Sequence, residues 1–233
     1  MTLHRFFVNP DEVVGDFFPI PAGIRHQVTH VLRLHSGERL MLLDGQGQAL
    51  VVRLEGHDCR VEERLPAAGE ARHRLTVWQA LLRGDHLEPV IRHGTELGVH
   101  AFRLFVSDRC VAREVSARRL ERLRTIAREA AEQSERGAVP EVSAPIPFAE
   151  ALRAAGAEPS VLLYERADGP RLSAVEPPRG VVIGPEGGFT PDEVAAAEAA
   201  GLTVAGLGPR ILRSESVALA VAAVVMSRTG DFA

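Results

Sequence analysis

The chain of 233 residues contains no lysine, so arginine supplies all 27 of its basic side chains. It has only two cysteines, Cys59 and Cys110, which argues against a disulfide framework and fits a reducing compartment. No uncharged apolar run approaches the roughly 20 residues that a membrane span needs, and no basic and apolar signal opens the sequence. These absences predict a globular, cytoplasmic protein.

Metal and nucleotide fingerprints are also missing. The nine histidines are scattered and do not combine with the cysteines in the spacing of a zinc site, so we expect no metal. Neither a P-loop nor a dinucleotide-binding glycine pattern occurs. The net charge of -4 gives no global signature of nucleic-acid binding, so any RNA contact must come from a local basic patch.

Two glycine-containing turns near the C-terminus are the most informative feature that is present. A β-branched run at 181–183 leads into the first turn, GPEGGF at 184–189, and the second turn opens the segment GLGPRILRSES at 206–216. A strand without charge suits a parallel sheet that is buried on both faces, and glycines let bare backbone come close to a ligand. One such turn alone is more often structural, but two can wall one pocket.

Helix signals follow both turns. Thr190 is the expected N-cap of a helix that has Pro191 at its first position, Glu193 closing a capping box and Gly201 as the stop. Ser214 is the expected N-cap of a final helix over 215–228. That helix is rich in valine and alanine, so we expect it to be buried, and a second subunit is one candidate for what covers it.

The pattern along the chain predicts two domains. Short strands at 5–8, 39–44, 49–54 and 58–63, with a hairpin turn at 44–47, indicate a β-rich N-terminal part, followed by a linker at 66–71. From residue 75 the elements alternate: strands at 75–80, 102–107 and 161–164, helices at 85–97 and 116–136, and a further element at 148–155. This alternation predicts an α/β fold whose mostly parallel sheet is covered by helices on both faces.

The strings around the two turns resemble the C-terminal motifs of the RsmE family, bacterial 16S rRNA (uracil-N3)-methyltransferases of the SPOUT superfamily. Further segments resemble the family in the same order: HRFF at 4–7, QALLRGD at 79–85, TELGV at 95–99, SDRC at 107–110 and EQSER at 132–136. Arg83 and His93 depart from the family, which usually carries lysine at both positions. Arg83 keeps the charge, whereas a histidine carries little charge at pH 7, which weakens any phosphate contact expected there.

The resemblance implies an architecture and partners that the pattern alone does not give. It implies a PUA-like RNA-binding β-barrel at 1–68 and a SPOUT methyltransferase domain at 73–233, with a parallel sheet and a deep trefoil knot. It also implies S-adenosylmethionine as cofactor, a homodimer, and 16S rRNA within the 30S subunit as substrate, methylated at N3 of one uridine.

The resemblance further implies site residues. The cofactor is expected between three loops, at Leu162, Leu163, Tyr164, Gly184, Pro185, Glu186, Gly187, Gly188, Leu207, Gly208, Arg210, Ile211 and Leu212. A uracil N3 must lose its proton and have its anion stabilised, which favours a cation beside the ring carbonyls. Arg210 and Arg213 are the candidates, weighed against a surface ion pair with Glu215. Glu132, Gln133 and Arg136 are candidates for orienting the uridine, and the general base is not identified.

For RNA docking the candidates are Arg5, Arg25, His26 and Arg33. The arginines at 113–128 alternate with glutamates at helical spacing, so a solvated helix face is the better interpretation there. For Glu186, a contact with the cofactor and a turn-capping role are equally weighted. Two other functions stay open: methylation of a ribose 2′-hydroxyl by a related enzyme, and a non-catalytic RNA-binding module whose glycine turns build a dimer.

Overall fold

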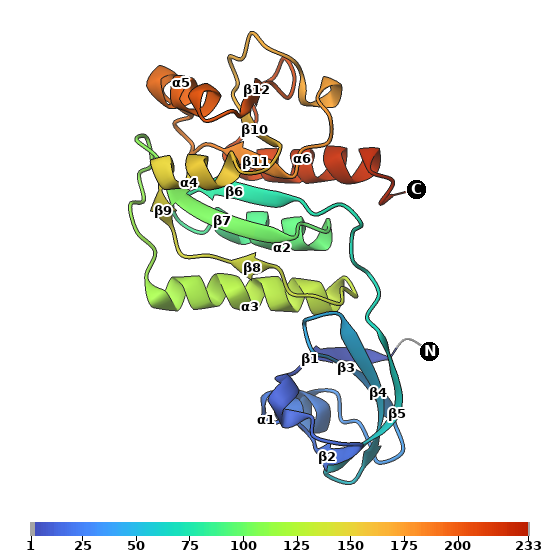
Figure 1. The fold of residues 1–233 in the computed structure, drawn as a ribbon. Helices are drawn as coiled ribbons and strands as arrows, with labels where there is room; N and C mark the ends of the chain where they lie inside the picture. The colour runs from blue at the N-terminus through green and yellow to red at the C-terminus, as the bar shows by residue number, and fades with distance from the viewer. Residues whose placement is uncertain (1–2, 233) are drawn as a thin grey trace. The chain divides into compact units, whose positions relative to one another are not determined.

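The computed structural model describes residues 3–232, and the chain divides into two compact units. The smaller unit contains the chain up to Glu70 together with Ala131–Val139, and the larger unit contains the remainder (Figure 1). The outer ends of the predicted domains, residues 1 and 233, lie outside the described residues.

The smaller unit is built on five strands. Its elements are β1 (His4–Phe7), η1 (Pro10–Glu12), β2 (Phe17–Pro19), α1 (Ala22–His26), the π-helical η2 (Gln27–Val31), β3 (Arg39–Leu43), β4 (Gln48–Glu55) and β5 (Asp58–Pro66). The predicted strands near β1, β3, β4 and β5 are confirmed, as is the hairpin between β3 and β4. The sequence analysis missed β2 and the short helices, because three to five residues carry too little periodicity.

These strands form one sheet in the order β1-β3-β4-β5-β2. The pairs β3–β4, β4–β5 and β5–β2 are antiparallel, and β1 runs parallel to β3. Among the residues that the structure describes, β1 and β2 are edge strands that no pairing joins, so the sheet is open here and a closed barrel is not confirmed. Phe6, Phe18, Ile24 and Leu40 pack in its core beside Cys59, whose burial raises the pKa of the thiol to about 11.

The larger unit alternates strands and helices. Its elements are β6 (Thr76–Ala80), α2 (Leu87–Glu96), β7 (Ala101–Val106), α3 (Ala117–Gln133, whose last three residues belong to the smaller unit), β8 (Glu141–Val142), β9 (Ile146–Pro147), α4 (Phe148–Ala155), β10 (Ser160–Leu163), η3 (Leu172–Ala174), β11 (Gly180–Ile183), α5 (Pro191–Ala199), β12 (Thr203–Ala205) and α6 (Ser214–Arg228).

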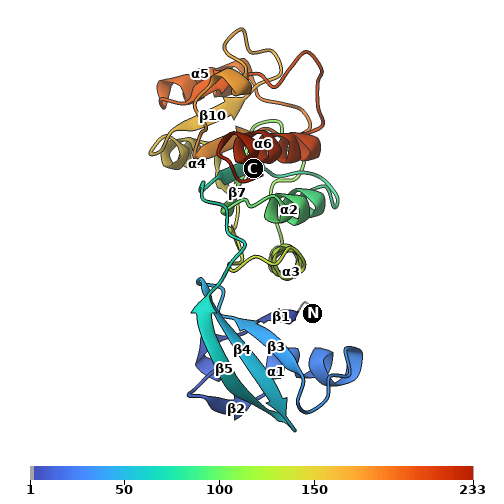
Figure 2. The same ribbon diagram turned by 90° about the vertical axis from the view of Figure 1, so that its right-hand side faces the viewer.

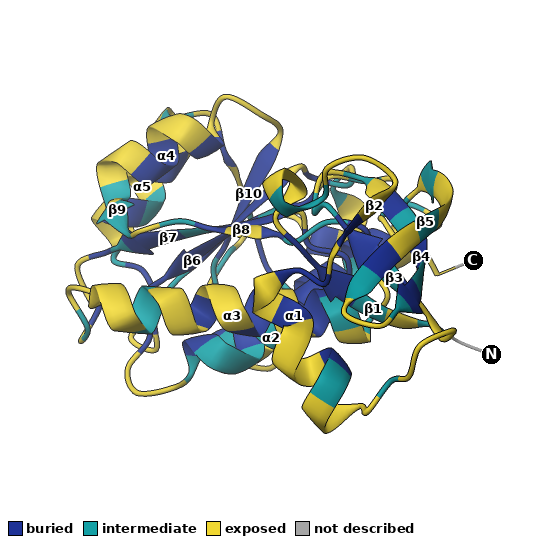
Figure 3. Cartoon of the chain, turned by 90° about the horizontal axis from the view of Figure 1, so that it is seen from below, coloured by how far each residue is buried: buried dark blue, intermediate teal, exposed yellow. Residues whose placement is uncertain are grey.

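All pairings in its seven-stranded sheet are parallel, in the order β12-β10-β11-β6-β7-β8, with β9 also on β7. Figure 2 shows α4 and α5 on one side of this sheet and α2 and α6 on the other. The predicted α/β class with a parallel sheet covered on both faces is therefore confirmed. Figure 3 shows the central strands buried and the outward face of α3 exposed, as expected for a sheet sandwiched between helices.

The predicted start of α5 is confirmed in detail. The Thr190 hydroxyl accepts from Glu193 N–H at 3.1 Å, and the Glu193 carboxylate accepts from Thr190 N–H at 2.9 Å, which completes the capping box. After α5 the chain leaves the helix at Gly201, with φ +86. The Glu193 carboxylate also accepts Asp108 N–H at 2.9 Å, and this bond joins the start of α5 to the loop after β7.

The prediction of Ser214 as an N-cap is wrong. Arg213 holds the N-cap position with no side-chain cap, and Ser214 is the first helical residue of α6. The Ser214 hydroxyl instead donates to Gly184 O at 2.5 Å, because the first turn lies within its reach and offers a carbonyl that needs a donor.

Candidate active site

Three neighbouring parallel strands end at one edge of the larger sheet. Leu163 of β10 pairs with Ile183 of β11 on one side and with Ala205 of β12 on the other. The segments that follow these residues therefore leave the sheet side by side, although they are far apart in the sequence. Loops beyond the carboxyl ends of parallel strands are where open α/β sheets bind ligands.

These segments enclose a cavity of about 550 Å³, within the range typical of small-molecule sites. Its lining consists of Arg83, His86, Leu163, Tyr164, Glu165, Ile183, Gly184, Pro185, Glu186, Gly187, Gly188, Phe189, Leu207, Gly208, Arg210, Ile211, Leu212, Arg213, Ser214, Glu215 and Val217. All of these residues belong to the larger unit.

The structure brings together all but one of the residues expected to hold the cofactor. The exception is Leu162, which is fully buried within β10 and does not line the cavity. Arg213 also lines the cavity, as Arg210 does. That these residues bind the cofactor or the substrate stays a prediction, but the predicted enclosure by three loops is the geometry observed.

Several groups from outside the first turn fix its conformation. Gly188 has φ +67, a left-handed conformation that side chains disfavour, and its N–H donates to Pro185 O at 2.9 Å. The Arg109 guanidinium donates to Gly187 O at 3.0 Å and to Phe189 O at 3.2 Å. The Glu186 carboxylate accepts Arg83 N–H at 3.0 Å, a contact that accords with its turn-capping alternative.

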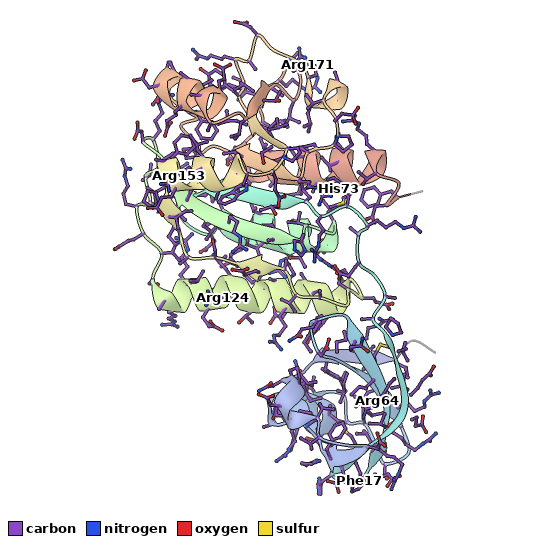
Figure 4. The ribbon with its side chains drawn as sticks, viewed as in Figure 1. Phe17, Arg64, His73, Arg124, Arg153 and Arg171 are labelled. Carbon is purple, nitrogen blue, oxygen red and sulfur yellow. The ribbon has the colours of Figure 1, made fainter. Side chains whose placement is uncertain are left out.

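The second turn is anchored at Gly206, where it begins, and at Ser214, just beyond its end. Gly206 N–H donates to Pro170 O at 3.0 Å, and Gly206 O accepts Leu172 N–H at 2.9 Å. The loop that carries these partners includes Arg171, which Figure 4 labels above the sheet. Within the described part of the chain, no hydrogen bond or ion pair involves residues 207–212. Ile211 is 79% exposed, an unusual state for so large an apolar side chain.

Charges of both signs line the cavity. The positive side chains are Arg83, Arg210 and Arg213, and the negative ones are Glu165, Glu186 and Glu215. Within the described residues Glu215 forms no ion pair with an arginine, and its basic partner is His86, with Nδ1 3.5 Å from Oε1. Among residues 3–232, Arg210 and Arg213 form no ion pair, so both are available to an anionic group.

The sequence analysis missed His86 and Glu165 as lining residues. A signal was present for both, since Glu165 directly follows the predicted cofactor residue Tyr164, and His86 directly follows the family-like segment ending at Asp85. Neither carries a motif of its own. Adjacency to a motif was therefore the only available clue.

Glu132, Gln133 and Arg136 are not among the residues that line the cavity, and they belong to the smaller unit. Glu132 Oε1 accepts Phe7 N–H at 3.0 Å, and Arg136, only 3% exposed, donates to Glu70 at 2.8 and 3.2 Å. Gln133 is exposed. These contacts give Glu132 and Arg136 a structural task in the smaller unit, and their role toward the uridine stays a prediction.

The four RNA-docking candidates lie in the smaller unit. Arg25, His26 and Arg33 are exposed on the segment from α1 to just beyond η2, where the ring of His26 stacks on His30 with centroids 5.1 Å apart. Arg33 has φ +53, rare for a side chain of this size. Arg5 is different, because it forms an ion pair with Glu135 at 2.8 Å.

The described residues hold neither a metal-binding cluster nor a membrane-spanning helix. Within residues 3–232, no cluster of three or more histidine, cysteine, aspartate or glutamate side chains has the arrangement to hold a metal ion. No helix in the same range combines the length and the apolar character needed to cross a bilayer.

Comparison with known proteins places the chain. An RNA methyltransferase domain model matches residues 69–226. The ribosomal RNA small subunit methyltransferase E of Synechocystis sp. is 35% identical over 222 residues, which cover 91% of this chain and 73% of that protein. The counterpart from Bacillus subtilis is 32% identical and covers 91% of this chain and 90% of its own length.

Solved structures agree. A ribosomal RNA small subunit methyltransferase E from Neisseria gonorrhoeae bound to S-adenosyl methionine has a TM-score of 0.86 at 30% identity, covering 97% of this chain and 98% of that one. The predicted class, an S-adenosylmethionine-dependent rRNA methyltransferase, is thereby confirmed. The chain belongs to the ribosomal RNA small subunit methyltransferase E family.

Proposed function

We propose that the protein methylates N3 of one uridine in 16S rRNA, with S-adenosylmethionine bound in the cavity between its two C-terminal turns. The observation that carries this proposal is the position of Arg210 and Arg213. Both line the same cavity as the glycine turns and neither is engaged in an ion pair within the described chain. One cavity therefore combines the glycine turns proposed for the cofactor with two arginines that are available to the substrate.

The residues present fit the cofactor. A cavity of about 550 Å³ is large enough for an adenosyl group, and Leu163, Ile183, Leu207 and Leu212 give it aliphatic walls. Gly184, Gly187, Gly188 and Gly208 line the cavity and, having no side chain, present bare backbone to it. Flat adenine between aliphatic walls and bare backbone needs little side-chain charge, which leaves the arginines for the substrate.

The bound cofactor supplies an electrophilic methyl group on its sulfonium. The protein must align that carbon with N3, and such orientation can lower the barrier by about 7–11 kcal/mol. Because N3 loses its proton, negative charge spreads onto the uracil carbonyl oxygens. Arg210 and Arg213 are placed to stabilise that charge, an effect of preorganised cations that is strongest in a site shielded from water.

The finer features of the architecture belong to the same proposal. They are domain limits at 1–68 and 73–233, a PUA-like barrel that holds rRNA through Arg5, Arg25, His26 and Arg33, a deep trefoil knot around the cofactor loops, and a cytoplasmic location.

A homodimer is proposed on the surface of α6. Several apolar residues on one face of this helix, at i, i+3 and i+7, are only half buried: Val217, Ala220 and Val224. Ile211 and Leu212, just before it, are exposed. A contiguous apolar surface of this kind marks a protein interface, and its position beside the cavity predicts that a second copy shields the site. Light scattering of the purified protein tests this prediction.

Nucleoside analysis tests the proposed product. Small-subunit rRNA from a deletion strain should lack 3-methyluridine, and incubation with the purified protein and S-adenosylmethionine should restore it. Loss of a 2′-O-methylated nucleoside instead would support the ribose alternative, and no change in any nucleoside would support the non-catalytic module. Running the incubation on naked 16S rRNA and on 30S subunits in parallel identifies the substrate form.

A further inference from the structure

A buried glutamine in the central strand of the larger sheet is unexplained by packing. Gln79 is fully buried in β6, where it pairs with Ile183 of β11 and Leu104 of β7, and its strand neighbours Trp78 and Ala80 are buried as well. Its side-chain Oε1 has no partner among the residues that the structure describes. An apolar side chain would fill the same space without leaving an acceptor unsatisfied.

The amide nitrogen of Gln79 begins a directed chain of hydrogen bonds. Nε2 donates to the Ser214 hydroxyl at 3.0 Å and to Ala80 O at 3.2 Å. The Ser214 hydroxyl in turn donates to Gly184 O at 2.5 Å. Ala80 O can only accept a hydrogen bond, so the amide nitrogen of Gln79, rather than its oxygen, must face Ala80 and Ser214. The Ser214 hydroxyl therefore accepts from Gln79 and donates to Gly184 O.

This chain joins the two walls of the cavity. Gly184 is the first residue of the first turn, and Ser214 directly follows the second turn as the first residue of α6. Gly184 is followed by Pro185, which has no N–H. In the peptide group between these two residues, the Gly184 carbonyl is therefore the only group that can form a hydrogen bond. Ser214 itself lines the cavity.

We propose that Gln79 and Ser214 are positioning residues that set the spacing between the two turns, and thereby the fit of the adenosyl group. The inference rests on the proposed function, because it assumes that the cofactor lies between these turns. Gln79 acts through Ser214, and Ser214 acts through Gly184. Neither is required to take part in the methyl transfer itself.

A matched pair of substitutions separates the hydroxyl from the shape of residue 214. Ser214→Thr keeps the hydroxyl, and Ser214→Val has the same shape without it. We expect Ser214→Val to raise the calorimetric Kd for S-adenosylmethionine about tenfold, the effect of losing one buried hydrogen bond, while Ser214→Thr stays within about twofold of the parent. In turnover assays the loss should fall on the KM for the cofactor more than on kcat.

Gln79→Met provides a second, independent arm. Methionine fills a similar volume and removes the unsatisfied acceptor, so the thermal midpoint of the cofactor-free protein should equal or exceed that of the parent while the Kd for the cofactor rises severalfold. A merely structural glutamine would show the opposite: a lower midpoint with unchanged Kd.

The outcomes are distinguishable. Parent-like Kd values for both Ser214→Val and Gln79→Met would overturn the proposal, and so would equal losses for Ser214→Thr and Ser214→Val. If Ser214→Val does not fold, Gln79→Met decides alone. A parent protein that binds the cofactor in neither the presence nor the absence of rRNA would refute the proposed function, whereas a binding parent with unaffected variants would refute only the positioning role.

Discussion

The two turns that wall the cavity differ in how they are held. The first, Gly184–Gly188, is fixed by side chains or backbone from three other segments, through Arg109, Arg83 and Ser214. The second is anchored at Gly206, and over 207–212 no hydrogen bond or ion pair occurs within the described chain. The first wall is therefore preformed, whereas residues 207–212 of the second wall can change conformation when they contact a ligand. The cations proposed for the substrate, Arg210 and Arg213, lie on the adjustable side.

The largest expected effect tests whether that adjustable wall carries the chemistry. Arg213→Ala should reduce the rate of methyl transfer to small-subunit rRNA about 10²- to 10³-fold, as for loss of one oxyanion-stabilising donor. The free energy of unfolding should change by less than about 0.5 kcal/mol, because the side chain is exposed and unpaired. Arg153→Ala on α4, labelled in Figure 4, is the matched control with the same loss of charge away from the cavity. Equal rates for the two variants would remove Arg213 from the mechanism.

Hydrogen exchange compares the two walls directly. In the cofactor-free protein the amides of 207–212 should exchange faster than that of Gly188 in the first turn, because they have no partner in the described chain whereas Gly188 N–H donates to Pro185 O. At a cofactor concentration of 100 Kd, their exchange should slow by up to about 100-fold. The first turn should change much less. Equal protection of Gly188 and of 207–212 before the cofactor is added would show that the second turn is held as firmly as the first.

Matched glycine substitutions sharpen the comparison further. Gly188 has φ +67, so Gly188→Ala should destabilise the cofactor-free protein by about 1–2 kcal/mol and weaken cofactor binding. An added Cβ at Gly208 meets nothing within 4 Å, so Gly208→Ala should change stability by less than about 0.5 kcal/mol. Denaturant unfolding measures both. A larger cost at Gly208 would show that the second turn is as constrained as the first.

The smallest expected effect concerns the clamp on the first turn. Arg109→Ala removes two hydrogen bonds to turn carbonyls and should raise the cofactor Kd about fivefold, since those carbonyls can still reach water. Arg109→Lys keeps the charge but loses the planar guanidinium that reaches both carbonyls. Its Kd for the cofactor should lie between those of the parent and the alanine variant. A lysine variant as weak as alanine would show that geometry, rather than charge, holds the turn.

Local signals in the sequence predicted local structure well. The capping box of Thr190 and Glu193 was readable because all its partners lie within four residues, and the strand before Gly184 was readable from its β-branched composition. The parallel class of the sheet followed from the alternation of strands and helices. The enclosure by three loops came from the resemblance to a family, since no single turn identified it.

Long-range partners were not predictable in the same way. Ser214 looks like an N-cap by residue type, but its hydroxyl goes to Gly184, 30 residues away, and to Gln79, 135 residues away. Gln79 was visible as a polar residue in an apolar strand, yet only the sheet order shows what it touches. Whether the five-stranded sheet of the smaller unit closes into a barrel depends on edge pairing, for which residue patterns give no register.

The shared carboxylate of Glu193 makes the start of α5 and the loop after β7 a single cooperative element. This side chain is only 6% exposed and accepts from Thr190 N–H and from Asp108 N–H, and the next residue along, Arg109, clamps the first turn. Fraying of one helix end therefore releases the loop and the clamp together. As temperature rises, the ligand pocket should lose its shape in one step with the first turn of α5, well before the sheet beneath it melts.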